Sequence, residues 1–253
     1  MIQKVRKFGF LTKGFIYAII GILTFLAAFD LGGKIANKNS VISFLEQQLF
    51  GKILLFILGL GMLSYANWRF YKSFIVLKKK DTKNKFIFSI DYFFRGLIYA
   101  SFSLSILYQV FNLKLNRVSK ETVVSKILDI ENGIYILYSI AFMVLISSLN
   151  QFYIAFSKNY LKNIKKSNNI ESFEFLNKSG RFGITARGIS FLIFSWFIFK
   201  ASSNSNPDQV KGTQEMFSYL QSLTLGNFLM AVMAIGFISY GIFQYFYARY
   251  SSI

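Results

Sequence analysis

The chain has 253 residues and contains no cysteine, no histidine and a single proline, Pro207. Without cysteine and histidine it has no disulfide, no thiolate nucleophile and no histidine base, and it lacks the usual ligands of haem and zinc. Acidic residues are also scarce, with 11 Asp and Glu against 29 Lys and Arg. We therefore expect no metal, no cofactor and no catalytic constellation, and we predict that the protein is not an enzyme.

Apolar and aromatic residues are abundant instead. They make up 54% and 19% of the chain, respectively, a composition that water-soluble domains rarely reach. Long apolar runs cover residues 8–29, 50–71, 89–111, 132–156, 182–201 and 225–247. Each has about the 20 residues that a helix needs to cross some 30 Å of hydrocarbon. The sequence predicts an all-α polytopic membrane protein with six transmembrane helices.

The net charge of +18 is distributed unevenly between the two sides of such a bundle. If the amino terminus is cytoplasmic, 20 of the 29 Lys and Arg residues fall on the inner side, and 7 of the 11 acidic residues fall outside. This is the positive-inside pattern, and it predicts that both termini are cytoplasmic. The charge therefore indicates topology and not nucleic-acid binding, although "KKKDTKNK" (78–85) has the composition of a segment that binds anionic lipid headgroups at the cytoplasmic face.

Internal similarity is the most informative pattern in the chain. Three segments share the order basic residue, Gly, apolar residues and an aromatic: "FGFLTKGFIYAIIG" (8–21), "IDYFFRGLIYASFS" (90–103) and "FGITARGISFLIFS" (182–195). The glycine after the basic residue is Gly14, Gly96 or Gly188. A second glycine follows it after 37, 37 and 38 residues, at Gly51, Gly133 and Gly226. Such constant spacing predicts three tandem repeats.

A short amphipathic segment lies between the two long helices of each predicted repeat, at residues 40–50, 122–130 and 214–223. These segments are too short and too polar to span a bilayer, so each is predicted to be a short helix in the outer interface. The predicted repeat is therefore helix, interfacial helix, helix, with pseudo-threefold symmetry. We expect one membrane domain over 1–253, with repeat units 8–71, 90–153 and 182–246.

At these residues the sequence resembles a family of bacterial integral membrane proteins, those of domain of unknown function 1206. That family consists of repeated two-helix units that open with an Arg-Gly element similar to "ARGISF" here. The second copy departs most, with Asp91 and Tyr92 in the region where the others have Phe8–Gly9 and Phe182–Gly183. The resemblance implies this fold and a location in the bacterial cytoplasmic (inner) membrane, and it carries no established activity.

The repeated basic residue is the candidate functional feature. Counting from the outer helix ends places Arg187 about 10 Å, and Lys13 and Arg95 about 5 Å, inside the inner boundary of the hydrocarbon. The predicted polar cluster also includes acceptors and polar residues at similar depth, and the adjacent glycines are predicted to mediate helix packing. The cluster is Lys13, Arg95, Arg187, Tyr17, Tyr99, Arg69, Gln151 and Gln244, and the packing glycines are Gly14, Gly96 and Gly188.

Two interpretations of this cluster stay open at the level of sequence. The basic residues are either independent interfacial anchors, since a long side chain reaches water from such depth, or a ring of cations about the predicted axis. Asp91 and Arg95 lie four apart and are expected to pair, which would neutralise one member of a ring.

The predicted function likewise has two alternatives. The main prediction is a structural or accessory membrane subunit or scaffold, with the bilayer and a membrane protein as partners. The alternative is a pathway or binding site for a small solute, an anion or a lipid headgroup, built on the inner basic cluster.

Overall fold

The computed structural model describes residues 2–78, 85–112, 120–161, 164 and 170–251. Within these residues six helices are long and apolar enough to cross a membrane. They are α1 (Ile2–Ala28), α3 (Gly51–Lys78), α4 (Lys85–Val110), α6 (Gly133–Ser157), α7 (Ile170–Ser203) and α9 (Gly226–Tyr250). The prediction of an all-helical protein with six membrane-spanning helices is confirmed.

Short elements connect the long helices. They are α2 (Lys38–Glu46), α5 (Lys120–Leu128), α8 (Thr213–Gln221) and the 3-10 turns η1 (Asn159–Leu161) and η2 (Pro207–Gln209). Side-chain hydrogen bonds cap the amino-terminal ends of α2 and α8. The Asn37 side chain accepts from the Ser40 amide, and the Glu215 side chain accepts from the Gly212 amide. The helices α2, α5 and α8, together with η2, lie between long helices at one end of the bundle, which we call the connector side, whereas η1 lies between α6 and α7 at the other end.

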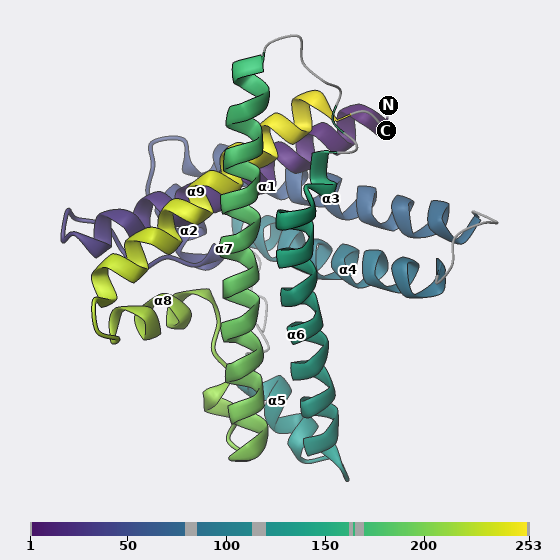
Figure 1. Cartoon of the computed structure of the whole chain (residues 1–253), viewed down its shortest axis with the longest axis vertical. Helices are drawn as coiled ribbons and strands as arrows, with labels where there is room; N and C mark the ends of the chain where they lie inside the picture. Colours follow the sequence, from purple (N-terminus) through teal and green to yellow (C-terminus); the bar gives the residue numbers. More distant parts are fainter. Residues whose placement is uncertain (1, 79–84, 113–119, 162–163, 165–169, 252–253) are drawn as a thin grey trace.

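The opposite end carries both chain termini, and we call it the termini side. The two termini lie together in Figure 1. The Arg6 guanidinium donates to the Ser251 hydroxyl at 2.8 Å and to the Ser251 carbonyl at 2.6 Å, which ties the start of α1 to the end of α9. A chain that crosses a membrane an even number of times has both termini on the same side.

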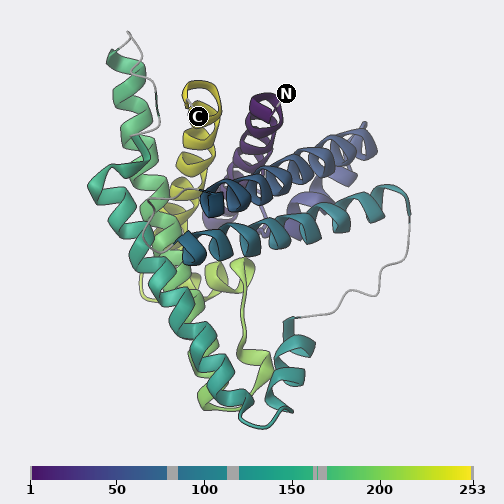
Figure 2. The ribbon, with the colours of Figure 1, turned by 90° about the vertical axis from the view of Figure 1, so that its right-hand side faces the viewer.

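The long helices pack most closely in pairs that differ from the pairs of the predicted repeat units, which are α1 with α3, α4 with α6 and α7 with α9. α3 lies along α4, α6 along α7, and α1 along α9, and the pairs cross one another at steep angles (Figures 1 and 2). α1 also packs against α3, and α7 against α9. The contacts therefore follow a ring, α4–α3–α1–α9–α7–α6.

Residues at matching positions of the predicted repeats meet in the three main pairs. Ser103 donates to the Gly59 carbonyl, and Ser195 donates to the Ala141 carbonyl, at 2.7 and 2.8 Å. In the third pair Gly21 takes the place of serine, and a Cβ atom on it would lie 2.6 Å from the Ala234 carbonyl oxygen. Small residues thus let the backbones approach closely, as membrane helices require. The pseudo-threefold axis itself stays a prediction, which superposition of the three units tests.

The ring is interrupted between α4 and α6, where the described residues make no substantial packing contact. In the other two units, the corresponding helices meet at a glycine. A Cβ atom on Gly9 would lie 2.6 Å from the Cα atom of Tyr65, and one on Gly183 would lie 2.5 Å from the Cα atom of Tyr240. Counted from the basic residue, Asp91 takes the place of these glycines. Its side chain excludes so close an approach, which accounts for the separation of α4 from α6.

Two of the connecting helices begin inside the bundle. The amide of Ala36, just before α2, donates to the Thr24 hydroxyl, one turn before α1 ends. After α7 the chain returns along that helix before α8 starts (Figure 1), and Thr213 at the start of α8 lies near Ser190. The starts of α2 and α8 meet through a hydrogen bond between Asn37 and Gln214.

Candidate functional site

Lys13 lies at the centre of a buried group of tyrosines. Its ammonium donates to the Tyr65 hydroxyl at 3.2 Å and to the Tyr240 hydroxyl at 2.9 Å, and its side chain is 3% exposed. The rings of Tyr65, Tyr240 and Tyr99 surround the ammonium, with centroids 4.9 to 5.4 Å away. Aromatic faces attract a cation, so these rings offset part of the cost of removing it from water.

Arg187 reaches the same group from α7. Its guanidinium donates to the Tyr240 hydroxyl at 2.7 Å and lies over the rings of Tyr240 and Tyr17. The residue is 8% exposed, so the deepest of the three repeated cations is buried and has a polar partner. Its Nε atom is buried and has no hydrogen-bond partner. One donor of a buried cation is therefore unused.

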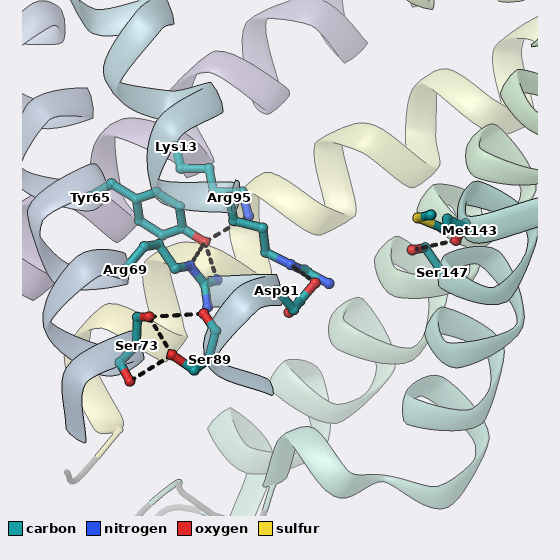
Figure 3. A network of polar contacts seen from close by, with 9 residues as sticks. All are labelled: Lys13, Tyr65, Arg69, Ser73, Ser89, Asp91, Arg95, Met143 and Ser147. Atoms are coloured by element: carbon teal, nitrogen blue, oxygen red, sulfur yellow. Dashed lines mark hydrogen bonds and ion pairs between the residues drawn. The ribbon is translucent and has the colours of Figure 1, made fainter. Parts of the chain in front are cut away.

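Two further cations lie on α3 and α4 (Figure 3). Arg69 donates through Nε to the Tyr65 hydroxyl at 2.9 Å, and a second nitrogen of the same guanidinium also donates to this oxygen. Arg95 forms the expected pair with Asp91, with 2.8 Å between Nε and the carboxylate. This pair is partly exposed, whereas Lys13 and Arg187 are buried.

A cavity of about 400 Å³ joins these side chains on the termini side of the bundle. In the described part of the chain, five basic residues and one acidic residue line it. The basic residues are Lys13, Arg69, Lys72, Arg95 and Arg187, and the acidic residue is Asp91. Aromatic and aliphatic side chains complete the wall, among them Trp68, Ile154, Ile184 and Phe243.

The structure brings six of the eight predicted cluster residues to the wall of this cavity. They are Lys13, Arg69, Arg95, Gln151, Arg187 and Gln244. The other two, Tyr17 and Tyr99, lie behind the wall, with ring centroids 4.9 Å from Tyr240 and 4.6 Å from Tyr65. Whether this cluster acts as a functional site stays a prediction.

The three predicted packing glycines lie at helix contacts of different tightness. A Cβ atom on Gly14 would lie 2.7 Å from the Gly241 carbonyl oxygen, in the seam between α1 and α9. On Gly96 and Gly188 it would meet the rings of Phe70 and Phe152 at 2.7 and 3.1 Å. The first contact is with backbone, which cannot move aside, whereas the other two are with side chains.

Sequence reasoning missed several residues of the site. Tyr65 and Tyr240 each follow the second glycine of their unit, Gly51 or Gly226, by 14 residues, so their equivalence is visible in the sequence, but their role as acceptors for Lys13 is not. Lys38, at the start of α2, also reaches the cluster and lies over the rings of Tyr99 and Phe102. Its placement depends on the inward course of the chain before α2, which no local pattern predicts.

Lys38 and Arg187 both line a second, much smaller cavity of about 30 Å³ on the connector side of Tyr17. Burial lowers the pKa of the Lys38 ammonium from its ordinary value, with a further contribution from the Arg187 charge. Positive charge is therefore concentrated on both sides of the tyrosine group.

The chemistry available to this site is limited by its side chains. The described residues contain no group of three acidic residues that could hold a metal ion, and the cavity has no nucleophile paired with a base. Guanidinium and ammonium donors bind carboxylates, sulfates and phosphates. The arrangement is suited to holding an anionic group.

Comparison with known proteins agrees with this architecture. Residues 8–75 and 182–251, together more than half of the chain, match the family described as Domain of Unknown Function (DUF1206). The chain belongs to this family. The two matched regions are the first and third predicted units, so the match leaves out the middle unit, in which Asp91 replaces glycine.

A relative from Bacillus subtilis (strain 168), named "Uncharacterized protein YxxB", is 22% identical over 249 residues. The aligned region covers 96% of this chain and 88% of that protein. No solved structure matches the chain. Neither family nor relative indicates an enzymatic activity.

Proposed function

We propose that this DUF1206 membrane protein binds an anionic group, such as a phosphate, in the basic cavity on its termini side. The observation that carries the proposal is the charge of the cavity wall, five Lys and Arg residues against Asp91 in the described chain. A negatively charged ligand would balance the excess positive charge of this wall.

The energetic argument rests on depth and burial. A charged side chain inside a bilayer costs at least about 2.5–3.5 kcal/mol, so such residues pair with one another or with a ligand. Lys13 and Arg187 are 3% and 8% exposed and have no acidic partner among the described residues. At an effective dielectric constant of 20, an anion 4 Å from one cation gains about 4 kcal/mol.

Unused hydrogen-bonding atoms indicate where the ligand contacts the protein. The Nε atom of Arg187 has no partner, and neither does Oε1 of the Gln244 amide, although both are buried. Both residues line the cavity. Because an amide end accepts or donates according to its orientation, the ligand that fits combines an anionic oxygen with a further polar group such as a hydroxyl.

The distribution of charge supports a cytoplasmic position of the termini side, in a bacterial inner membrane. The cavity would then face the cytoplasm and the inner leaflet, where phosphate groups of both solutes and lipids are present. The inner leaflet also attracts basic segments generally.

A structural or accessory subunit is the second candidate. It is favoured by the tyrosine hydroxyls, which already accept from Lys13, Arg69 and Arg187 without any ligand. In that case the cluster holds the four helices α1, α3, α7 and α9 together, and the partner is another membrane protein.

Tryptophan fluorescence separates the two candidates. Trp68 lines the cavity, whereas Trp196 is 54% exposed and lies elsewhere, so Trp196→Phe leaves a single reporter in the wall. We expect inorganic phosphate to change the emission of this protein in detergent. Arg95→Gln is expected to raise the phosphate concentration at half-saturation about tenfold, the effect of losing one charged hydrogen bond.

Arg181→Gln is the matched control, because Arg181 is an exposed cation of α7 outside the cavity wall. It is expected to leave the phosphate titration unchanged. Equal titrations of the Arg95 and Arg181 variants, or no response to phosphate at all, would exclude this anion site and favour the structural role.

A further inference from the structure

The cavity reaches the interruption in the ring of helices. Asp91, Tyr92 and Arg95 of α4 line it on one side, and Asn150 and Ile154 of α6 line it on the other. These two helices make no substantial contact within the described residues. The gap between them is therefore the place where the cavity wall is not closed by helix packing.

The side chains that line the cavity become more exposed towards this gap. Asp91 and Asn150 are exposed and Arg95 is partly exposed, whereas Lys13 and Arg187 at the far wall are buried. Figure 3 shows the Asp91–Arg95 pair on α4, facing away from the Tyr65 group. Both helices are long and apolar enough to span a membrane, so in a bilayer an opening between them would face the lipid sideways.

The sequence of the middle unit accounts for this opening. Asp91 stands in place of Gly9 and Gly183, and Ser147 stands in place of the tyrosines that contact those glycines. The first and third units keep both members of the contact. A lateral opening is thus built at one of three equivalent positions, in the unit that lies outside the family match.

We propose that the ligand is a membrane phospholipid with an anionic headgroup, which enters sideways between α4 and α6. This inference rests on the proposed function, because it identifies the source of the bound phosphate. The acyl chains stay in the bilayer at the mouth, next to Ile154, while the headgroup enters the basic cavity. A free solute has no need of a side entrance.

The wall offers a contact for each part of such a headgroup. Arg95 exchanges the Asp91 carboxylate for the lipid phosphate, and Nε of Arg187 provides the unused donor. The free amide end of Gln244 takes a headgroup hydroxyl. Phosphatidylglycerol has this combination of phosphate charge and hydroxyls, so it is the probe that we choose.

Quenching by brominated lipids tests the side entrance directly. In a background of Trp68→Phe and Trp196→Phe, the Ile154→Trp substitution places one tryptophan at the mouth. The protein is reconstituted in phosphatidylcholine vesicles that contain an equal fraction of brominated phosphatidylglycerol or brominated phosphatidylcholine. We expect the relative binding constant at this site to favour phosphatidylglycerol about fivefold, the effect of one basic side chain near an anionic lipid.

Two variants and one control define the site. Arg95→Gln removes the phosphate contact, and Asn150→Phe fills the mouth, so each is expected to abolish the preference. Leu149→Trp, in place of Ile154→Trp, reports on a neighbouring position of α6 that is 58% exposed and lies outside the cavity wall. It is expected to be quenched equally by the two lipids.

The outcomes separate this inference from the anion site itself. If the two lipids quench the Ile154→Trp protein equally while inorganic phosphate still changes the Trp68 emission, the side entrance is wrong and the anion site stands. If phosphate also has no effect, both proposals fall. A preference that survives Asn150→Phe would overturn the entrance between α4 and α6.

Discussion

Removal of the Tyr240 hydroxyl is the most direct test of the buried cluster. This oxygen accepts from Lys13 at 2.9 Å and from Arg187 at 2.7 Å, so Tyr240→Phe deletes both hydrogen bonds and creates no cavity. Interhelical hydrogen bonds in membranes contribute about 0.6–1.7 kcal/mol each. We expect a loss of about 1–3 kcal/mol, or roughly 4–8 °C in Tm for a loss of 2 kcal/mol in a chain of this size.

The double variant Tyr65→Phe with Tyr240→Phe makes the prediction sharper. Lys13 donates to both hydroxyls, so either single variant leaves it one acceptor and the double variant removes both. A buried ammonium without an acceptor costs more than the loss of either bond, since the full desolvation penalty then appears. The double loss should exceed the sum of the single losses by about 0.5–3 kcal/mol.

Thermal unfolding in lipid-free micelles measures these effects. Tyr245→Phe is the control, because Tyr245 lies on the same helix, is 49% exposed and lines an apolar groove. It should change stability by less than about 0.5 kcal/mol. Strict additivity of the two tyrosine variants would refute the view that Lys13 depends on both hydroxyls.

Two further predictions concern packing and pH. Gly9→Ala should destabilise the bundle by about 1–3 kcal/mol, because its Cβ atom would meet the Tyr65 backbone at 2.6 Å. Gly188→Ala should stay within about 1 kcal/mol of the parent, because its neighbour at 3.1 Å is the partly exposed side chain of Phe152 and not backbone, and because alanine favours the helix; equal losses in thermal melts would contradict this. Lys38→Gln should stabilise the protein near neutral pH, since burial lowers the pKa of Lys38 and charging it opposes folding. This advantage should shrink as the pH rises from the lowered pKa towards the ordinary lysine value, and a gap independent of pH in melts from pH 7 to 10 would count against it.

Hydropathy alone predicted the six spanning helices, because a continuous apolar run has few alternatives in a bilayer. It placed their ends less well. α7 begins at Ile170, whereas the predicted run begins at residue 182, since polar residues such as Asn177 and Arg181 extend the helix beyond the apolar part. A helix that continues into water needs no apolar residues, so hydropathy carries no signal for it.

The candidate site was predictable in its charges but not in its partners. The repeated Lys13, Arg95 and Arg187 were visible as a periodic feature. Their acceptors lie on other helices, and the order in which helices pack around a ring leaves no trace in local sequence. The starting depth of α2 was unpredictable for the same reason, and with it the role of Lys38.

The seam between α1 and α9 lies across the ring from the interruption. Gly14 and Gly241 meet there backbone to backbone. Next to this contact, Tyr17 packs on Phe237 and Tyr240 across the seam. This contact joins the first and the last long helix, so the fold is closed by pairing the two ends of the chain. A larger residue at either glycine would therefore disturb the contact between α1 and α9, at the point of the ring opposite the mouth between α4 and α6.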